Sequence, residues 1–151
     1  MNFRLLKRDD KNGLIRLLEQ LSQKKIDSKH FCIHHLISNH HCRCLIVEQD
    51  GRIIGFGALV LYLTPLNGNV ARIEDVIVDI EFRGKGVGKE IMQTLIKWAA
   101  INHVKKIVLT SNPKREAARG LYESLGFNKV DTEVFVREIS LENARELIAN
   151  G

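Results

Sequence analysis

Apolar and polar positions alternate along this chain with two different periods, and the changes of period outline its elements. Apolar side chains recur three or four residues apart over residues 11–22 and 89–100, which predicts two amphipathic helices. Further helical patterns cover residues 27–39, 114–125 and 140–149. Short apolar or alternating runs predict strands over residues 3–8, 42–48, 52–63, 70–78 and 106–110, with two more at 126–127 and 133–139. The order β-α-α-β-β-β-α-β-α-β-β predicts an α/β layer fold around a mixed sheet.

Length and composition fit one domain. The chain has 151 residues and is 44% hydrophobic, so a single domain over residues 1–151 can bury a core. No window approaches the roughly 18–20 consecutive apolar residues that a bilayer span needs, and the first residues lack the apolar segment of a signal peptide. Three cysteines, a small and odd number, suit a reducing compartment. We therefore expect a cytoplasmic protein with no membrane partner.

The positive net charge narrows the choice of partners. The formal charge is +5 at pH 7, but the basic residues are scattered and aromatic residues make up only 6% of the chain. Because zinc-finger spacing, aromatic stacking motifs and basic runs are all missing, we expect no nucleic-acid partner. Part of the charge is expected to attract a small anionic ligand instead.

A glycine-rich turn is the most informative local feature of the sequence. Residues 83–88 read Arg-Gly-Lys-Gly-Val-Gly, after the apolar run 73–78 and before the helix predicted from Lys89. Free N–H groups and the positive end of the helix dipole meet at such a turn, which suits a phosphate or pyrophosphate. A Walker loop does not fit, because Lys89 is followed by Glu90 and the glycine spacing is wrong. The dinucleotide fingerprint would need a third glycine where Lys89 stands, and the strand order does not match it.

Two motifs together make the chain resemble a known family. The first is Val78-Asp79-x-x-Phe82-Arg83-Gly84-Lys85-Gly86-Val87-Gly88, and the second is Leu121-Tyr122-x-x-Leu125-Gly126-Phe127. With these motifs the chain resembles, over almost its whole length, the GNAT superfamily of acetyl-coenzyme A-dependent N-acetyltransferases. The resemblance implies a mixed, mostly antiparallel sheet flanked by helices, in which two central strands splay apart and admit the cofactor.

The resemblance also implies how acetyl-coenzyme A would be held as the co-substrate. Backbone groups of Val76, Ile77 and Val78 would bind the pantetheine arm like an added strand, with one N–H polarising the thioester carbonyl. The pyrophosphate would be wrapped by the amides of Arg83, Gly84, Lys85, Gly86, Val87, Gly88 and Lys89. Many relatives carry an asparagine seven residues before the motif tyrosine, where this chain has Arg115, and Asn112 stands three residues earlier. Both Asn112 and Arg115 are therefore candidates for holding the cofactor.

Three side chains are candidates for the chemistry of acetyl transfer to an amine. Glu74 is the first candidate for the base, directly or through a water, and Asp75 is either the base or a ligand of the acceptor ammonium. Adjacent strand residues point to opposite faces, so only one reaches the site unless a bulge, typical of this family here, intervenes. Structural ion pairs are the alternative for both. Tyr122 matches the family's tyrosine near the cofactor sulfur and is the candidate general acid, with core packing as its alternative.

The sequence indicates the acceptor amine less clearly than the acetyl donor. Residues 73–76 and 134–137 resemble glucosamine 6-phosphate N-acetyltransferases, whereas residues 110–127 resemble aminoalkylphosphonate and other small bacterial-type acetyltransferases. Both resemblances imply a small primary amine that carries an anionic group. A protein or peptide N-acetyltransferase and a non-catalytic acyl-coenzyme A-binding module are the alternatives.

Substrate binding would then need a cation for the anionic group of the acceptor. Arg137, together with Lys24 or Lys25, is the candidate for this counter-charge, while Glu74 and Asp75 would contact the amine. Homodimerisation is common in similar enzymes, so a homodimer is a further expectation from the resemblance.

Histidines and cysteines are concentrated in one stretch. Five of the six histidines and all three cysteines lie between His30 and Cys44. Both residue types are zinc ligands, but the spacing Cys42-x-Cys44 is not the Cys-x-x-Cys of structural zinc sites. We therefore expect no metal, and the alternatives for the stretch are a wall of the acceptor pocket or incidental use.

Overall fold

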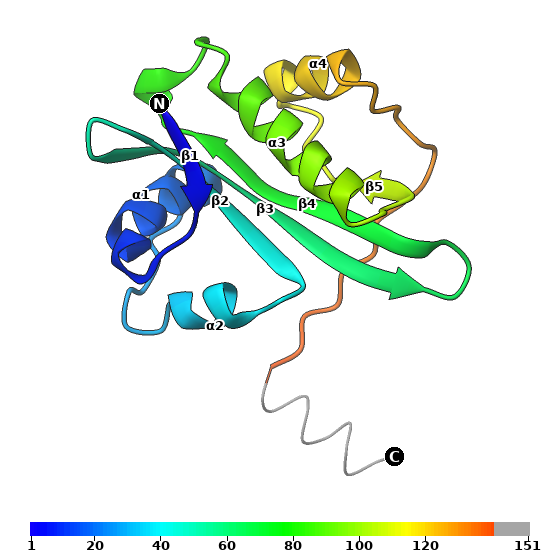
Figure 1. Ribbon diagram of the computed structural model, residues 1–151, viewed down its shortest axis with the longest axis horizontal. Coiled ribbons are helices and arrows are strands. Elements are labelled where there is room, and N and C mark those ends of the chain that lie inside the picture. Colours follow the sequence, from blue (N-terminus) through cyan, green and yellow to red (C-terminus); the bar gives the residue numbers. More distant parts are fainter. Residues whose placement is uncertain (141–151) are drawn as a thin grey trace.

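The protein, a computed structural model, is described over residues 1–140, which form one five-stranded sheet with helices on both faces (Figure 1). The strands lie in the order of the sequence, and every neighbouring pair is antiparallel except β4 and β5, which run parallel. They are β1 (Asn2–Leu5), β2 (Cys42–Gln49), β3 (Arg52–Thr64), β4 (Gly68–Val78) and β5 (Lys106–Val108). The expected mixed, mostly antiparallel sheet is confirmed.

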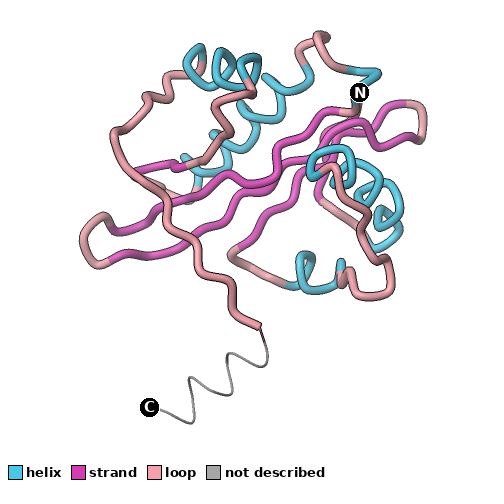
Figure 2. The backbone as a smooth tube through the Cα atoms, turned by 180° about the vertical axis from the view of Figure 1, so that it is seen from behind, coloured by secondary structure: helices cyan, strands magenta, loops and turns pink. Residues whose placement is uncertain are grey.

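The helices divide between the two faces of the sheet (Figures 1 and 2). On one face lie α1 (Lys11–Ser22) and α2 (Ile33–Ser38), and on the other lie α3 (Val87–Ile101) and α4 (Glu116–Ser124). Two short 3₁₀ turns, η1 (Arg8–Asp10) and η2 (Ile80–Phe82), precede α1 and the glycine-rich turn. Among residues 1–140, no helix combines the length and the apolar character that crossing a membrane requires.

The core has two layers because the central strand β3 is buried on both sides. Its residues 53–59 are all buried, as expected for a strand with helices above and below. One layer contains Leu45, Leu59 and the α3 residues Ile91 and Leu95, and α4 packs against it. The other layer lies under α1 and α2. This packing fixes the ends of α1, α3 and α4 around one end of β4.

Strand β4 loses its partner on one side part-way along its length. β5 pairs with it only at Val70, Ala71 and Arg72. Residues Ile73, Glu74, Ile77 and Val78 remain paired with β3, and no described residue pairs with residues 73–78 on the opposite side. The end of β4 therefore offers an open strand edge, whose backbone groups are available to a ligand.

One expected helix is shorter than its pattern suggests. The carboxylate of Asp27 accepts a hydrogen bond from the backbone N–H of Lys29 at 2.8 Å, and the Asp27 carbonyl accepts from the N–H groups of His30 and Phe31. These bonds close a turn, a conformation that aspartate favours over a regular helix. As a result α2 begins only at Ile33 instead of near Asp27.

The two strands expected at 126–127 and 133–139 are not formed, because residues 126–140 contain neither helix nor strand. The side chains of Val134, Phe135 and Val136 are 65, 88 and 81% exposed. An alternating pattern gives a strand only where another strand and a covered face are available to it, and these side chains meet no such face. The helix expected over 140–149 extends into residues 141–151, outside the described part of the chain.

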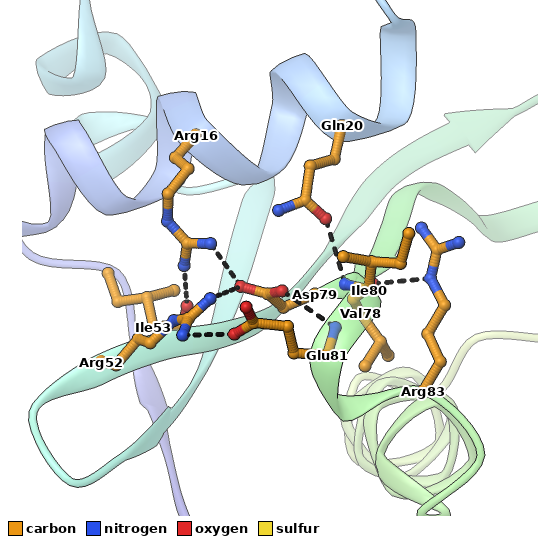
Figure 3. Close-up of polar contacts among 9 residues, drawn as sticks. All are labelled: Arg16, Gln20, Arg52, Ile53, Val78, Asp79, Ile80, Glu81 and Arg83. Carbon is orange, nitrogen blue, oxygen red and sulfur yellow. Dashed lines mark hydrogen bonds and ion pairs between the residues drawn. The ribbon is translucent and has the colours of Figure 1, made fainter.

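A buried carboxylate fixes the chain just after β4. The Asp79 side chain is fully buried and lies between α1, β3 and η2 (Figure 3). Arg16 of α1 and Arg52 of β3 both donate to its Oδ2, Arg52 at 2.9 Å, and its Oδ1 accepts from the backbone N–H of Glu81 at 3.2 Å. The Asp79 backbone N–H donates to the Ile54 carbonyl at 2.8 Å. We call these contacts the Asp79 clamp.

Further polar contacts extend the Asp79 clamp toward the glycine-rich turn (Figure 3). Gln20 of α1 accepts from the backbone N–H of Ile80 at 3.1 Å, and Arg52 forms a 2.5 Å ion pair with Glu81. Arg83 donates from Nε to the Val78 carbonyl at 3.1 Å. The segment that enters the turn is thus held from both α1 and β3.

The Asp79 clamp makes stability depend on pH. Burial by itself raises the pKa of Asp79, but hydrogen bonds from Arg16, the Glu81 N–H and Arg52 outweigh it and lower the pKa to about 2. The unfolded-state pKa of an aspartate is about 3.9. Because the folded-state pKa is the lower one, the ionised carboxylate stabilises the fold above about pH 4, and this contribution disappears as the pH falls toward about 2.

We expect Asp79→Asn to lower the free energy of unfolding by about 2 kcal/mol at neutral pH, because it removes a charge that two arginines hold. The deficit should shrink toward zero as the pH approaches 2, where the native Asp79 is itself being protonated. Urea unfolding at a series of pH values measures both effects. The control Asp131→Asn, at an exposed carboxylate, should change the free energy by less than about 0.5 kcal/mol. A deficit that is equally large at every pH would contradict the role given to the charge.

Candidate functional site

A cleft of about 790 Å³ lies beside the open edge of β4. Four parts of the fold meet there: the end of β4, the glycine-rich turn with the start of α3, the start of α4, and the end of α1. The lining residues are Gln20, Leu21, Gln23, Val76, Ile77, Val78, Phe82, Arg83, Gly84, Gly86, Val87, Gly88, Lys89, Lys114, Arg115, Glu116, Ala117, Ala118, Leu121 and Tyr122. The two sequence motifs, distant along the chain, therefore face a common space.

The glycine-rich turn has the backbone shape of an anion site. Gly84 and Gly86 have φ angles of 76° and 82°, in the left-handed region that favours glycine. A Cβ atom would meet nothing within 4 Å at either position, so conformation rather than space requires glycine there. Gly86 caps α3, and its carbonyl accepts from the N–H groups of Lys89 and Glu90. The N–H groups of Val87 and Gly88, the first of the helix, have no acceptor within it. Both residues line the cleft beside Arg83 and Lys89, which add positive charge.

A bulge in β4 lies at the inner end of the cleft. The register of β3 and β4 shifts between Phe56 and Ala58, and opposite this shift Asp75 adopts a left-handed φ of 53°. Such a conformation is uncommon for a residue other than glycine, although aspartate tolerates it better than most. The bulge interrupts the alternation of β4, as the resemblance implied. It places Glu74 and Asp75 just before Val76, the first β4 residue in the cleft lining.

The two adjacent carboxylates have different surroundings. Asp75 is exposed as a residue, yet the protein crowds its carboxyl group, and this partial burial raises its pKa, with the charge of Glu74 adding to the rise. Glu74 instead accepts a hydrogen bond from Nε of Arg72 in an ion pair. Glu74 therefore fits the ion-pair alternative, whereas Asp75 has the raised pKa that a base needs. Neither residue is part of the cleft lining, so the assignment of the base stays a prediction.

Tyr122 of α4 lines the cleft opposite the end of β4. Its ring packs edge-on against Phe127 with 6.2 Å between ring centroids. Burial raises the pKa of Tyr122, against a smaller opposing effect of Arg115. The phenol is thus fully protonated at neutral pH, the state that a proton donor needs.

Most of the residues expected at the cofactor reach the cleft, but a few lie elsewhere. Arg115 lines it and donates to the Leu21 carbonyl at 3.2 Å. Asn112 does not line it, and its side chain instead accepts from the Lys114 N–H at 2.9 Å. Lys85 turns back over the ring of Phe82, with Nζ 4.9 Å from the centroid.

The basic residues expected to bind the acceptor are not gathered around the cleft. Arg137 lies in the exposed segment 126–140 and is not part of the lining. Lys25 pairs with Glu19 at 3.2 Å, and neither it nor Lys24 lines the cleft. The counter-charge role of these three residues stays a prediction without geometric support.

Sequence reasoning missed two groups of residues. The first is the end of α1, where Gln20, Leu21 and Gln23 line the cleft, because nothing local marks a helix end as part of a site. The second is the Asp79 clamp. Asp79 belongs to the first motif, and an acidic residue directly after an apolar strand is a signal for a buried ion pair. Its arginine partners come from distant segments, so only the fold identifies them.

The histidines of the histidine- and cysteine-rich stretch lie exposed in and around α2, whereas Cys44 is buried in β2. His30 bonds to Asp27 at 2.7 Å, and His34 lies 3.4 Å from Arg8. Only Cys42 and Cys44 come together, with 3.7 Å between their sulfurs. Among residues 1–140, no three histidine, cysteine or acidic side chains converge as a metal ion would require.

Sequence comparisons point to one family. The profile of the acetyltransferase (GNAT) family matches residues 12–127. N-acetylaspartate synthetase of Xenopus tropicalis is 35% identical over 85 residues, which cover 56% of this chain and 30% of that protein. Glucosamine 6-phosphate N-acetyltransferase of Trypanosoma brucei brucei is 35% identical over 82 residues, which cover 53% of this chain and 54% of that protein. The chain thus spans about a third to about half of the length of these curated relatives.

Solved structures share the fold. Glucosamine-6-phosphate N-acetyltransferase from Arabidopsis thaliana matches with a TM-score of 0.77 at 24% identity, covering 90% of this chain and 97% of that one. Likeness at this identity shows a common architecture, and the family profile covers most of the chain. This chain therefore belongs to the GNAT family of acetyltransferases, enzymes that take the acetyl group from acetyl-coenzyme A.

Proposed function

We propose that the protein transfers the acetyl group of acetyl-coenzyme A directly to the primary amine of a small, anionic acceptor. One observation carries the proposal: the glycine-rich turn, the open edge of β4 and Tyr122 line a single cleft, and Asp75 directly precedes Val76, the first β4 residue of that lining. An anion site, a strand edge, a proton donor and a proton acceptor are the four parts that such a transfer needs.

The donor would lie along the open edge of β4. The pyrophosphate would accept hydrogen bonds from the amides of residues 84–89, where the α3 dipole favours negative charge. The pantetheine arm would pair with Val76, Ile77 and Val78, since these residues have no strand partner on that side. One of their N–H groups would donate to the thioester carbonyl and stabilise the oxyanion of the tetrahedral intermediate.

Two proton transfers would accompany the reaction, one from the attacking amine and one to the departing sulfur. Asp75, whose pKa is raised, would accept the proton that the amine loses as it attacks the thioester carbon. Tyr122 would give its phenolic proton to the coenzyme A sulfur as the carbon–sulfur bond breaks. Proton exchange between these groups and solvent would restore both for the next turnover. Glu74, in its ion pair with Arg72, would form part of the surface that the acceptor contacts.

The acceptor class is supported by the relatives and by the electrostatics. One relative is named for its product, N-acetylaspartate, and the other for its substrate, glucosamine 6-phosphate. Aspartate and glucosamine 6-phosphate are both primary amines that carry an anionic group. The net charge of +5 favours the approach of such an acceptor. Arg72, 38% exposed beside Glu74, offers a guanidinium on the acceptor side of β4.

An acceptor screen tests this class directly. Release of coenzyme A should be measured with amino-sugar phosphates, acidic amino acids, aminophosphonates, polyamines and peptide N-termini. We expect turnover with one or more of the anionic amines. Turnover with peptides or polyamines alone would show that the acceptor class is wrong, and binding of acetyl-coenzyme A without any turnover would favour a non-catalytic module.

Replacing Tyr122 by phenylalanine removes the proposed proton donor and keeps the ring. We expect kcat to fall roughly a hundredfold, because the thiolate then leaves without protonation. Coenzyme A affinity, measured by titration calorimetry, should stay unchanged. The control Tyr62→Phe alters the only other tyrosine, which is 41% exposed on β3, and should leave kcat unaltered. An unchanged kcat in Tyr122→Phe would remove this residue from the chemistry.

Asp75→Asn tests the base. We expect kcat/KM to fall roughly a hundredfold, and the loss of rate at low pH caused by protonation of Asp75 to disappear. Stability should not fall, because asparagine tolerates the left-handed backbone and the raised pKa shows that the native charge is disfavoured by folding. The matched change Glu74→Gln should have the smaller effect on rate. A larger loss in Glu74→Gln than in Asp75→Asn would transfer the role of base to Glu74.

A further inference from the structure

Two thiols lie together on the face of the sheet that α1 and α2 cover, outside the cofactor cleft. Cys42 and Cys44 stand two residues apart on β2, so their side chains share one face, and their sulfurs are 3.7 Å apart. Cys44 is 4% exposed, whereas Cys42 at the start of the strand is only half-buried. The Cys42 sulfur is therefore accessible to a small reagent, and the buried Cys44 sulfur is close enough to react with Cys42.

The protonation of the pair favours reaction at Cys42. The S–H of Cys44 donates to Cys42 and lowers the pKa of the Cys42 thiol to about 7, although burial and the charge of Asp75 act in the opposite direction. The same hydrogen bond, burial, the negative charge of a Cys42 thiolate and that of Asp75 raise the pKa of Cys44. The pair thus loses one proton easily and keeps the other.

We propose that Cys42 and Cys44 form a redox-sensitive dithiol, which closes to a disulfide and switches acetyl transfer off. With glutathione disulfide as oxidant, the Cys42 thiolate attacks one sulfur and releases one glutathione, leaving a mixed disulfide. Cys44 then loses its proton, attacks Cys42 Sγ and expels the second glutathione. Two protein thiols are oxidised to one disulfide, while one glutathione disulfide is reduced to two thiols that take up both protons.

Closure of the disulfide requires a local distortion at the start of β2. Two residues along a strand are separated by about 6.4–6.8 Å between Cα atoms. That spacing lies at the upper end of the range of about 4.4–6.8 Å found in disulfides. The sulfurs must approach from 3.7 Å to about 2.05 Å, and the two Cβ atoms, which a regular strand keeps about as far apart as the Cα atoms, must come to about 3.5–4.5 Å. Closure therefore needs a bend at Cys42, where β2 begins, as well as rotation about the two Cα–Cβ bonds. Cys32, exposed before α2, is not part of this pair, and it is replaced by serine in the tests so that it cannot take part in exchange.

The position of the pair links it to the transfer step rather than to the cofactor. Cys44 pairs across the sheet with Ala58, and Ala58 pairs with Glu74, so the dithiol and the bulge lie on the same line across β2, β3 and β4. The charge of Asp75 raises the pKa of both thiols, so the proposed base lies within electrostatic reach of them. Neither cysteine lines the cofactor cleft. Closure should therefore disturb Asp75 and leave cofactor binding intact.

Trypsin offers a direct test because Arg43 separates the two cysteines. Cys32→Ser protein is treated with glutathione disulfide, quenched with acid, alkylated and digested without reduction. We expect peptide 44–52 to be joined to peptide 30–43 by a reducible disulfide, and the linkage to be lost in Cys32→Ser variants that also carry Cys42→Ser or Cys44→Ser. Glutathione remaining on Cys42 while Cys44 is alkylated would overturn the proposal, and so would two unmodified thiols.

A second readout addresses the switch and rests on the proposed function. After closure in Cys32→Ser, acetyl transfer should fall about tenfold or more and recover with dithiothreitol, because a small displacement of Asp75 misaligns the base. Coenzyme A binding by calorimetry should be the same before and after oxidation. Full transfer activity after complete closure would overturn the switch. If no acceptor were acetylated at all, the proposed function would fail, while the peptide linkage would still decide whether the dithiol closes.

Discussion

The buried charge of Asp79 is the interaction on which the arrangement of the site depends. Its carboxylate accepts from Arg16 of α1 and Arg52 of β3, and it also caps the turn that leads to Gly84. Removing one partner of a buried ion pair is costly because the other charge is left without compensation. The Asp79 clamp therefore adds polar contacts between α1, β3 and the turn after β4, segments that strand pairing and apolar packing also bring together. It holds the glycine-rich turn in line with the open end of β4.

The open edge and the bulge of β4 are a second constraint, and they show where the fold departs from regularity. A regular sheet would continue the β4–β5 pairing past Arg72, and a regular strand would not place Asp75 in the left-handed region. The first departure leaves backbone groups of β4 without a strand partner. The second holds Asp75 in a backbone conformation that is strained for a residue other than glycine. Such local strain tends to be retained at functional sites, where binding or catalysis uses it.

The sequence allowed most of the fold to be predicted, because it depends on local patterns. The glycine-rich turn and the helix that follows it are read from residues that are adjacent in the chain, and the structure places both at the cleft. Features that depend on distant partners could not be predicted, such as the Arg16–Asp79 contact and the end of α1 in the cleft. For residues 133–139 the local pattern was misleading. Their alternation predicts a strand, but they form none in the described part of the chain.

The central claim is that one cleft holds acetyl-coenzyme A between the glycine-rich turn and the open edge of β4. A crystal structure of the protein with acetyl-coenzyme A tests it most directly. The account predicts pyrophosphate oxygens about 2.7–3.2 Å from backbone nitrogens of residues 84–89, with the pantetheine amides paired to Val76–Val78 and the thioester between Asp75 and Tyr122. A cofactor bound elsewhere, or a β5 that extends to pair with residues 73–78 when the cofactor is present, would contradict the account.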